Sequence, residues 1–274
     1  MRKISQALVL AGVVALPASL LFTPTASAED APAAASPFTG NFGLTTDYIF
    51  RGVTQTQHKP AVQGGFDYSH ASGIYLGTWA SNVSWVTEAL QPSGFKDNNS
   101  MEIDVYGGYK GSLGDVGYDV GVIHYYYPGS NVTGATDPDT TEVYVGASWK
   151  YVSLKYSHVV SDYFIAWGGP SGSGVSFDQK TKGSNYIDLS VSYPVAETWT
   201  LLGHYGHQKV KNYGDASYDD WKIGVSKDIG YGTVTLAYTD TNAKLTDAGG
   251  FDVYRWNSKE VADGRLALSF LKTF

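Results

Sequence analysis

The chain of 274 residues contains no cysteine, few charged residues and no long hydrophobic run beyond its N-terminus. The absence of cysteine excludes disulfide scaffolds, thiol catalysis and cysteine-based zinc sites. Charged residues make up 16% of the chain, against the ~25% of ordinary soluble domains. The net charge of −7, with no basic cluster outside the first three residues, argues against nucleic acid as a partner.

The N-terminal segment has the features of a secretory signal. Two basic residues precede an apolar run, and Ala26-Ser27-Ala28 matches the small-x-small cleavage pattern. We therefore predict a signal peptide over residues 1–28, a flexible Ala/Pro leader over 29–38 and a barrel over 39–274. The apolar run is shorter than a membrane-spanning helix, so we expect an exported protein and not an anchored one.

The remainder of the chain alternates between apolar and polar residues with a period of two, which predicts strands with one apolar face. Ile187 and Leu189, for example, flank Asp188. Most segments have the length of a tilted strand that crosses a bilayer, about 9–11 residues or slightly more. The predicted strands are 39–51, 60–71, 74–86, 100–110, 116–127, 140–149, 152–162, 184–193, 199–208, 218–227, 233–241 and 262–274.

The links between these segments alternate between short and long. Short links follow every second strand, and longer ones, such as 163–183 and 242–261, follow the others. This sorting is typical of an up-and-down transmembrane barrel, with tight periplasmic turns and long extracellular loops. We predict an all-β fold: a single antiparallel transmembrane β-barrel of about 12 strands. A periplasmic β-sandwich, with its polar face outside, is the alternative.

Tight turns predict which residues oppose each other across a hairpin. A two-residue turn at Lys150-Tyr151 pairs the apolar positions of both flanking strands on one face. The same reasoning at Ser72-Gly73 predicts that Tyr75, Trp79 and Val83 point outward. Large aromatic residues near strand ends are expected to form the interface girdles of the barrel. These are Tyr48, Phe50, Tyr68, Trp79, Tyr126, Trp149, Trp199, Tyr205 and Tyr238.

Two parts of the sequence resemble known outer-membrane proteins. The alternating Leu266, Leu268 and Phe270 with terminal Phe274 resemble the C-terminal signal that Gram-negative bacteria present to the barrel-assembly machinery. The stretch FGLTTDYIFRG at 42–52, with the segment 73–83, resembles the TorF family of porin-like proteins. The resemblance implies an outer-membrane barrel with a pore, and it brings no substrate and no catalytic residues.

Residues that could carry out chemistry do not form a recognisable site. Outer-membrane lipases with twelve strands need serine beside histidine, but the strand that lies between His124 and His158 separates these two, and no G-x-S-x-G motif is present. His204 and His207 are three residues apart on a strand, so they face opposite sides and make a poor metal pair. We assign no catalytic residue, no cofactor and no metal ligand.

The inward phase of the strands carries eight acids and five bases. This excess predicts a mildly cation-favouring, water-filled interior for small hydrophilic solutes. Ion pairs across a narrow barrel would instead give a plugged barrel that acts in adhesion or envelope structure through its outer loops. The predicted partners are outer-membrane lipid, the barrel-assembly machinery and small solutes. The sequence leaves open whether the chain also forms a homo-oligomer. The predicted pore-lining residues are Asp47, Arg51, Asp67, Glu102, Asp104, Lys110, Asp119, Glu142, Lys155, Asp188, Asp220, Lys222 and Arg265.

Overall fold

The computed structural model describes residues 36–90, 97–130, 136–168 and 179–274. The predicted signal peptide (1–28) and most of the predicted leader (29–38) lie outside the described residues. Among the described residues, no helix is long and apolar enough to cross a membrane.

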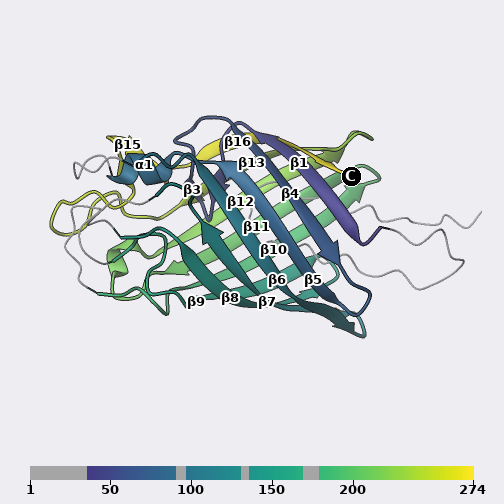
Figure 1. Ribbon diagram of the computed structural model, residues 1–274. Coiled ribbons are helices and arrows are strands. Elements are labelled where there is room, and N and C mark those ends of the chain that lie inside the picture. Colours follow the sequence, from purple (N-terminus) through teal and green to yellow (C-terminus); the bar gives the residue numbers. More distant parts are fainter. Residues whose placement is uncertain (1–35, 91–96, 131–135, 169–178) are drawn as a thin grey trace, which may run out of the picture.

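Twelve antiparallel strands form one closed barrel, as the alternation predicted. Neighbouring strands follow the chain order, and the first strand pairs with the last, so the sheet has no free edge. Figure 1 shows these strands steeply tilted around the barrel. They are β1 (Phe38–Thr45), β4 (Ala61–Ser69), β5 (Ile74–Asn82), β6 (Met101–Leu113), β7 (Val116–Tyr126), β8 (Thr140–Trp149), β9 (Val152–Val159), β10 (Asn185–Ala196), β11 (Trp199–Lys209), β12 (Tyr218–Asp228), β13 (Thr233–Thr241) and β16 (Arg265–Thr273).

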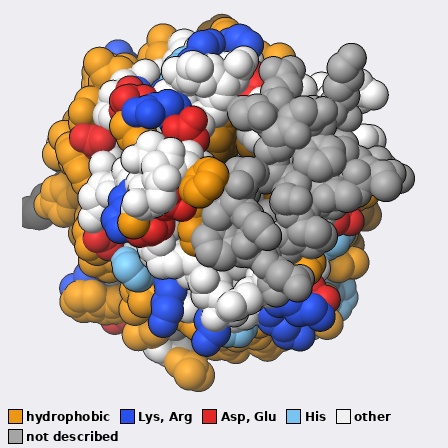
Figure 2. Space-filling view, turned by 90° about the vertical axis from the view of Figure 1, so that its left-hand side faces the viewer, with side chains coloured by type: hydrophobic (Ala, Val, Ile, Leu, Met, Phe, Trp, Pro, Cys, Tyr) orange, Lys and Arg blue, Asp and Glu red, His pale blue; other side chains and the backbone are white. Residues whose placement is uncertain are grey.

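Short turns gather at one end of the barrel and long connections at the other. The remaining elements belong to the long connections, and α1 and β15 lie at that end in Figure 1, opposite the C-terminus. Figure 2 looks onto this loop end, where charged side chains gather on the end face and hydrophobic ones form much of the outline. The small elements are β2 (Ile49–Phe50), β3 (Val53–Thr54), α1 (Trp85–Leu90), η2 (Gly214–Ala216), β14 (Arg255–Trp256) and β15 (Lys259–Glu260).

The outer surface of the barrel is apolar and the inner surface is polar. Val120 on β7 and Leu189 on β10 are 45% and 43% exposed, whereas the adjacent Asp119 and Asp188 are buried inside. A soluble protein would bury these aliphatic side chains, so this arrangement suits a barrel surrounded by hydrocarbon.

The hairpin of β8 and β9 confirms the register expected from a two-residue turn. Trp149 lies opposite Val152, and the apolar positions of both strands pair on the outer face. Lys150, the first residue of the turn, has a positive φ of 53°. Turns of this mirror-image kind match the twist of the two strands that they join.

The prediction for Tyr75, Trp79 and Val83 was wrong, because the preceding turn has three residues and not two. The Gly73 N–H donates to the His70 carbonyl, and Gly73 has a φ of 98°, so the loop is a tight turn followed by a left-handed residue. Tyr75 therefore pairs with Ser69 instead of His70. A shift of one residue moves every side chain to the other face of the sheet.

Three members of the predicted aromatic girdle also lie inside the barrel. Tyr48 is fully buried, Phe50 is nearly so, and Trp79 packs against Tyr48 with ring centroids 5.5 Å apart. Tyr126, Trp149, Trp199 and Tyr205 are exposed on the outside, as a girdle requires. Tyr48 and Phe50 belong to one hydrophobic cluster inside the barrel, and Trp79 packs against it.

Candidate functional site

The connection between β1 and β4, residues 46–60, folds into the barrel, and we call it the inner loop. It contains the short strands β2 and β3, joined by Arg51 and Gly52. Both turn residues have a positive φ, 47° and 81°, as a two-residue mirror-image turn requires. A Cβ atom on residue 52 would lie 2.4 Å from Thr241 Cγ2, so the tip presses on the wall and only glycine fits.

Arg51, at the tip of the inner loop, reaches across the lumen to the opposite wall. Its two terminal nitrogens donate to both carboxylate oxygens of Glu142 on β8, at 3.0 and 2.7 Å. One of them also donates to Gln208 Oε1 on β11 at 2.8 Å. The Arg51 side chain is 4% exposed and that of Glu142 is 0% exposed, so the paired charges are removed from water. Charge-assisted, bidentate pairs of this kind fix orientation strongly.

Aromatic rings surround the Arg51 guanidinium. Its central carbon lies 4.7 Å from the ring centroid of Phe50 and 4.3 Å from that of Tyr186. The Tyr218 hydroxyl donates to the Arg51 carbonyl at 2.8 Å, which ties the backbone of the tip to β12. The guanidinium is thus held by charge, by hydrogen bonds and by cation–π contacts.

A second residue of the inner loop, Tyr48, contacts another part of the wall. Its hydroxyl donates to Glu102 Oε1 at 2.7 Å, and the Tyr127 hydroxyl donates to Oε2 of the same carboxylate at 2.6 Å. The inner loop therefore joins β6 as well as β8, β11 and β12. It crosses the lumen as a fixed constriction.

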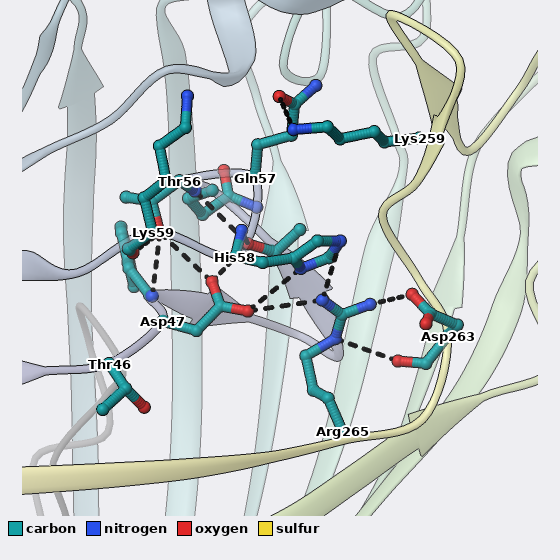
Figure 3. Close-up of polar contacts among 12 residues, drawn as sticks. Thr46, Asp47, Thr56, Gln57, His58, Lys59, Lys259, Asp263 and Arg265 are labelled. Carbon is teal, nitrogen blue, oxygen red and sulfur yellow. Dashed lines mark hydrogen bonds and ion pairs between the residues drawn. The ribbon is translucent and has the colours of Figure 1, made fainter.

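Asp47 anchors the base of the inner loop, as Figure 3 shows. Its carboxylate accepts hydrogen bonds from Thr54 and from Thr56, the latter at 3.1 Å. On the other oxygen it contacts His58 Nδ1 and Arg265 Nη1, each at 3.3 Å. Burial raises the pKa of the Asp47 carboxyl, whereas the Thr54 hydrogen bond and the Arg265 charge act in the opposite direction. The network closes the loop on itself and fastens it to β16.

Four of the five remaining acids predicted to face inward interact with hydrogen-bonding side chains inside the barrel. Asp67 accepts from Tyr106 at 2.6 Å, and Asp119 accepts from Tyr75 at 2.7 Å. The ring nitrogens of His204 lie 3.3 Å from Asp188 and 2.9 Å from Asp220. Asp104 is fully buried, and neither of its carboxylate oxygens has a hydrogen-bond partner within the described part of the chain.

The predicted bases lie among these acids. Lys155 Nζ lies 3.9 Å from the ring centroid of Tyr144, and Lys110 Nζ lies 5.4 Å from that of Tyr75. Lys222 borders a cavity of about 50 Å³ between the inner loop and the wall. The predicted pore-lining residues thus lie inside the barrel, and Arg51 with Glu142 and Asp47 with Arg265 are brought into direct contact.

Sequence reasoning missed the buried tyrosines and His204. Tyr48, Tyr75, Tyr127 and Tyr186 donate to lumen carboxylates, but tyrosine also suits a membrane interface, so alternation alone could not assign their face. The alternation could have placed His204 inside the barrel, because the next residue on the same strand, Tyr205, points outward.

The predicted assembly signal lies on β16 and at Phe274, which directly follows this strand. Leu266, Leu268 and Phe274 of the predicted assembly signal are exposed on the outside of the barrel. Phe270 lies on the same outer phase and pairs with Val234 of β13.

The histidines lie apart, as the sequence indicated. β8 separates His124 from His158, and His207 is exposed beside Asp219, away from the buried His204. Within the described residues, no group of three histidines or acids could hold a metal ion.

Comparison with known proteins places the chain in a family. The model of the Gcw_chp family, described as a bacterial protein of unknown function, matches residues 29–270. The chain belongs to the Gcw_chp family. The curated proteins include no match to this member of the family.

Solved structures share the barrel fold of this Gcw_chp protein. A KdgM porin structure has a TM-score of 0.50 at 8% identity and covers 86% of this chain and 99% of that chain. A KdgM porin in complex with disordered oligogalacturonate has a TM-score of 0.51 at 7% identity, with 86% and 99% coverage. A NanC porin has a TM-score of 0.47 at 9% identity, with 86% and 98% coverage. At these identities the similarity to KdgM shows the fold.

Proposed function

We propose that this Gcw_chp protein is an outer-membrane, porin-like channel for the passive diffusion of small hydrophilic solutes. The observation that carries the proposal is a closed barrel with an apolar outer surface and a charged, polar interior. Such a barrel satisfies every strand hydrogen bond without water, which is the requirement for crossing a bilayer with strands. The similarity of the fold to the KdgM porin supports it.

The composition of the lumen supports a weak preference for cations. Asp67, Glu102 and Asp119 are held by tyrosine hydroxyls, which donate hydrogen bonds but bring no positive charge. Among the predicted acids, Glu142 and Asp47 contact an arginine. Lys110, Lys155 and Lys222 offset part of the charge of the remaining carboxylates. The acids still outnumber the bases, which favours a negative potential in the interior, and a low dielectric around them strengthens their attraction for cations.

The resemblance of residues 42–52 and 73–83 to the TorF family extends this proposal to the family and the export route of the chain. We assign the chain to the TorF-type porins, exported by the signal peptide at 1–28 and inserted by the barrel-assembly machinery through its C-terminal strand. We propose no enzymatic activity, since no nucleophile with an adjacent base was found in the sequence.

Planar-bilayer recording of the purified, refolded chain tests the channel. We expect discrete current steps of low conductance, because the inner loop narrows the lumen. A folded protein that inserts into the bilayer and gives no current steps would remove the channel proposal.

A closed barrel that acts in adhesion or envelope structure is the second candidate. The observation that favours it is the inner loop, whose Tyr48 and Arg51 are buried and bonded to the opposite wall. Deletion of the loops 163–183 and 242–261 distinguishes the two functions. A channel should still conduct after the deletion, whereas an adhesin should lose attachment to its target surface.

A further inference from the structure

Exposed lysines gather where β10 begins and β11 ends, at the loop end of the barrel. Lys182 lies three residues before β10, Lys209 is the last residue of β11, and Lys211 follows it. Lys209 pairs with Asn185 across the two strands, and the Lys211 N–H donates to Ser184 Oγ at 2.9 Å. These two parts of the chain therefore lie side by side, and we call Lys182, Lys209 and Lys211 the lysine patch.

The charge of the lysine patch is not compensated by an ion pair among the described residues. Its three side chains are exposed, and none of them forms an ion pair within that part of the chain. Three described acids near the patch already have a basic partner: Asp162 with Lys180, Asp215 with Lys244 and Asp219 with His207. The patch therefore presents positive charge to an anionic ligand.

The apolar outer surface of the barrel adjoins the lysine patch. On β11 the outward-facing Leu201 and Tyr205 are 49% and 52% exposed, and Lys209 follows on the same face of the strand. Lys209 is four residues beyond Tyr205, which is about 13 Å along a strand. Tyrosine is typical of the membrane interface, and lysine extends its charged end toward water, so the patch lies at the level of lipid headgroups.

We propose that the lysine patch binds the phosphate group of a lipid in the membrane leaflet at the loop end, while the acyl chains of that lipid lie along β10 and β11. A phosphate monoester carries a charge of about −1.5 to −2 at pH 7 and accepts charge-assisted hydrogen bonds from lysine. A free anion would leave the adjoining apolar surface unused, so the surface favours a lipid. The inference rests on the membrane location in the proposed function, but it does not require conduction.

Native mass spectrometry of the refolded full chain in detergent micelles tests the proposal. The probes are diphosphoryl lipid A and the same lipid with both phosphates removed, titrated at one ionic strength. We expect a discrete complex with the phosphorylated lipid and much weaker binding of the other. Lys209→Gln combined with Lys211→Gln should weaken binding of the phosphorylated lipid about 25-fold, since each lysine near anionic lipid is worth about fivefold in affinity.

Lys150→Gln combined with Lys227→Gln is the matched control, because it makes the same change in net charge at the end with the short turns, where each lysine lies over a tryptophan ring. We expect this variant to change the affinity less than about twofold, because the patch is beyond the range of screened charges. Circular dichroism confirms folding of each variant.

Three outcomes would overturn the lipid proposal. They are equal binding of the two lipids, equal weakening by the two double variants, and binding of inorganic phosphate as tight as that of the phosphorylated lipid. Failure of the channel proposal is a different result, because binding in micelles is measured whether or not the protein passes current.

Discussion

The contact between Arg51 and Glu142 gives the sharpest test of how the inner loop is held. Replacement of Arg51 by Met keeps a straight chain between Phe50 and Tyr186 but leaves the Glu142 carboxylate, whose side chain is 0% exposed, without its charged partner. Loss of one partner of a buried pair costs about 3–5 kcal/mol. A loss of ~3 kcal/mol corresponds to roughly a hundredfold larger population of the undocked loop.

Hydrogen exchange measured by mass spectrometry on peptides that cover residues 46–60 reports this population directly. We expect these amides to exchange roughly a hundredfold faster or more in Arg51→Met, while the barrel strands stay protected. The double variant with Glu142→Gln should recover much of the protection, because no buried carboxylate is then left unpaired. Arg255→Met is the matched control, because the Arg255 side chain is 34% exposed. We expect this variant to change the free energy of opening of the inner loop by less than ~1 kcal/mol.

Two outcomes would refute the reasoning. If Arg51→Met leaves the exchange of the inner loop unchanged, the charge pair does not hold the loop in the lumen. If the double variant exchanges as fast as the single one, the loss arises from packing around the arginine and not from an unpaired Glu142.

Three other predictions concern the turn, the outer surface and the lumen charge. Gly52→Ala should lower the urea midpoint of unfolding well beyond Gly230→Ala. Both glycines have φ above 80°, but of the two only a Cβ atom at residue 52 would lie within 3 Å of atoms of the barrel wall. Equal midpoints would contradict the close fit of Gly52 against the wall. Val120→Arg places a charge on the outer surface at mid-strand and should destabilise the protein in lipid vesicles by about 2–4 kcal/mol. A stability equal to wild type would argue against contact with lipid there. Glu102→Gln combined with Asp104→Asn should lower cation selectivity, and an unchanged reversal potential under a salt gradient would refute the proposed lumen role.

The periodicity of the sequence was enough to predict the barrel. Successive side chains on a strand point to opposite faces for local reasons of backbone geometry, so the alternation around Asp188 is visible without knowledge of the fold. The sorting of short and long links follows from the same up-and-down order. The inward phase of most charged residues could therefore be assigned from the chain alone.

The face of the aromatic strand β5 could not be predicted reliably, because it depends on the length of one turn. Ala71 joins Ser72 and Gly73 in the loop, and this single extra residue turns Tyr75 toward Asp119. Tyrosine fits lipid headgroups and buried carboxylates equally well, so its chemistry does not decide between the two faces. Only the hydrogen bonds of the folded turn do.

The sequence alone thus determined the strands, their order and, except on β5, the polarity of their two faces, because these depend on neighbours along the chain. The tertiary structure alone decided that residues 46–60 turn into the barrel and cross it. That path depends on Arg51 meeting Glu142 and Gln208, which are 91 and 157 residues away along the chain. No local pattern encodes contacts between such distant residues, since they form only when the closed sheet brings opposite walls within reach of one side chain.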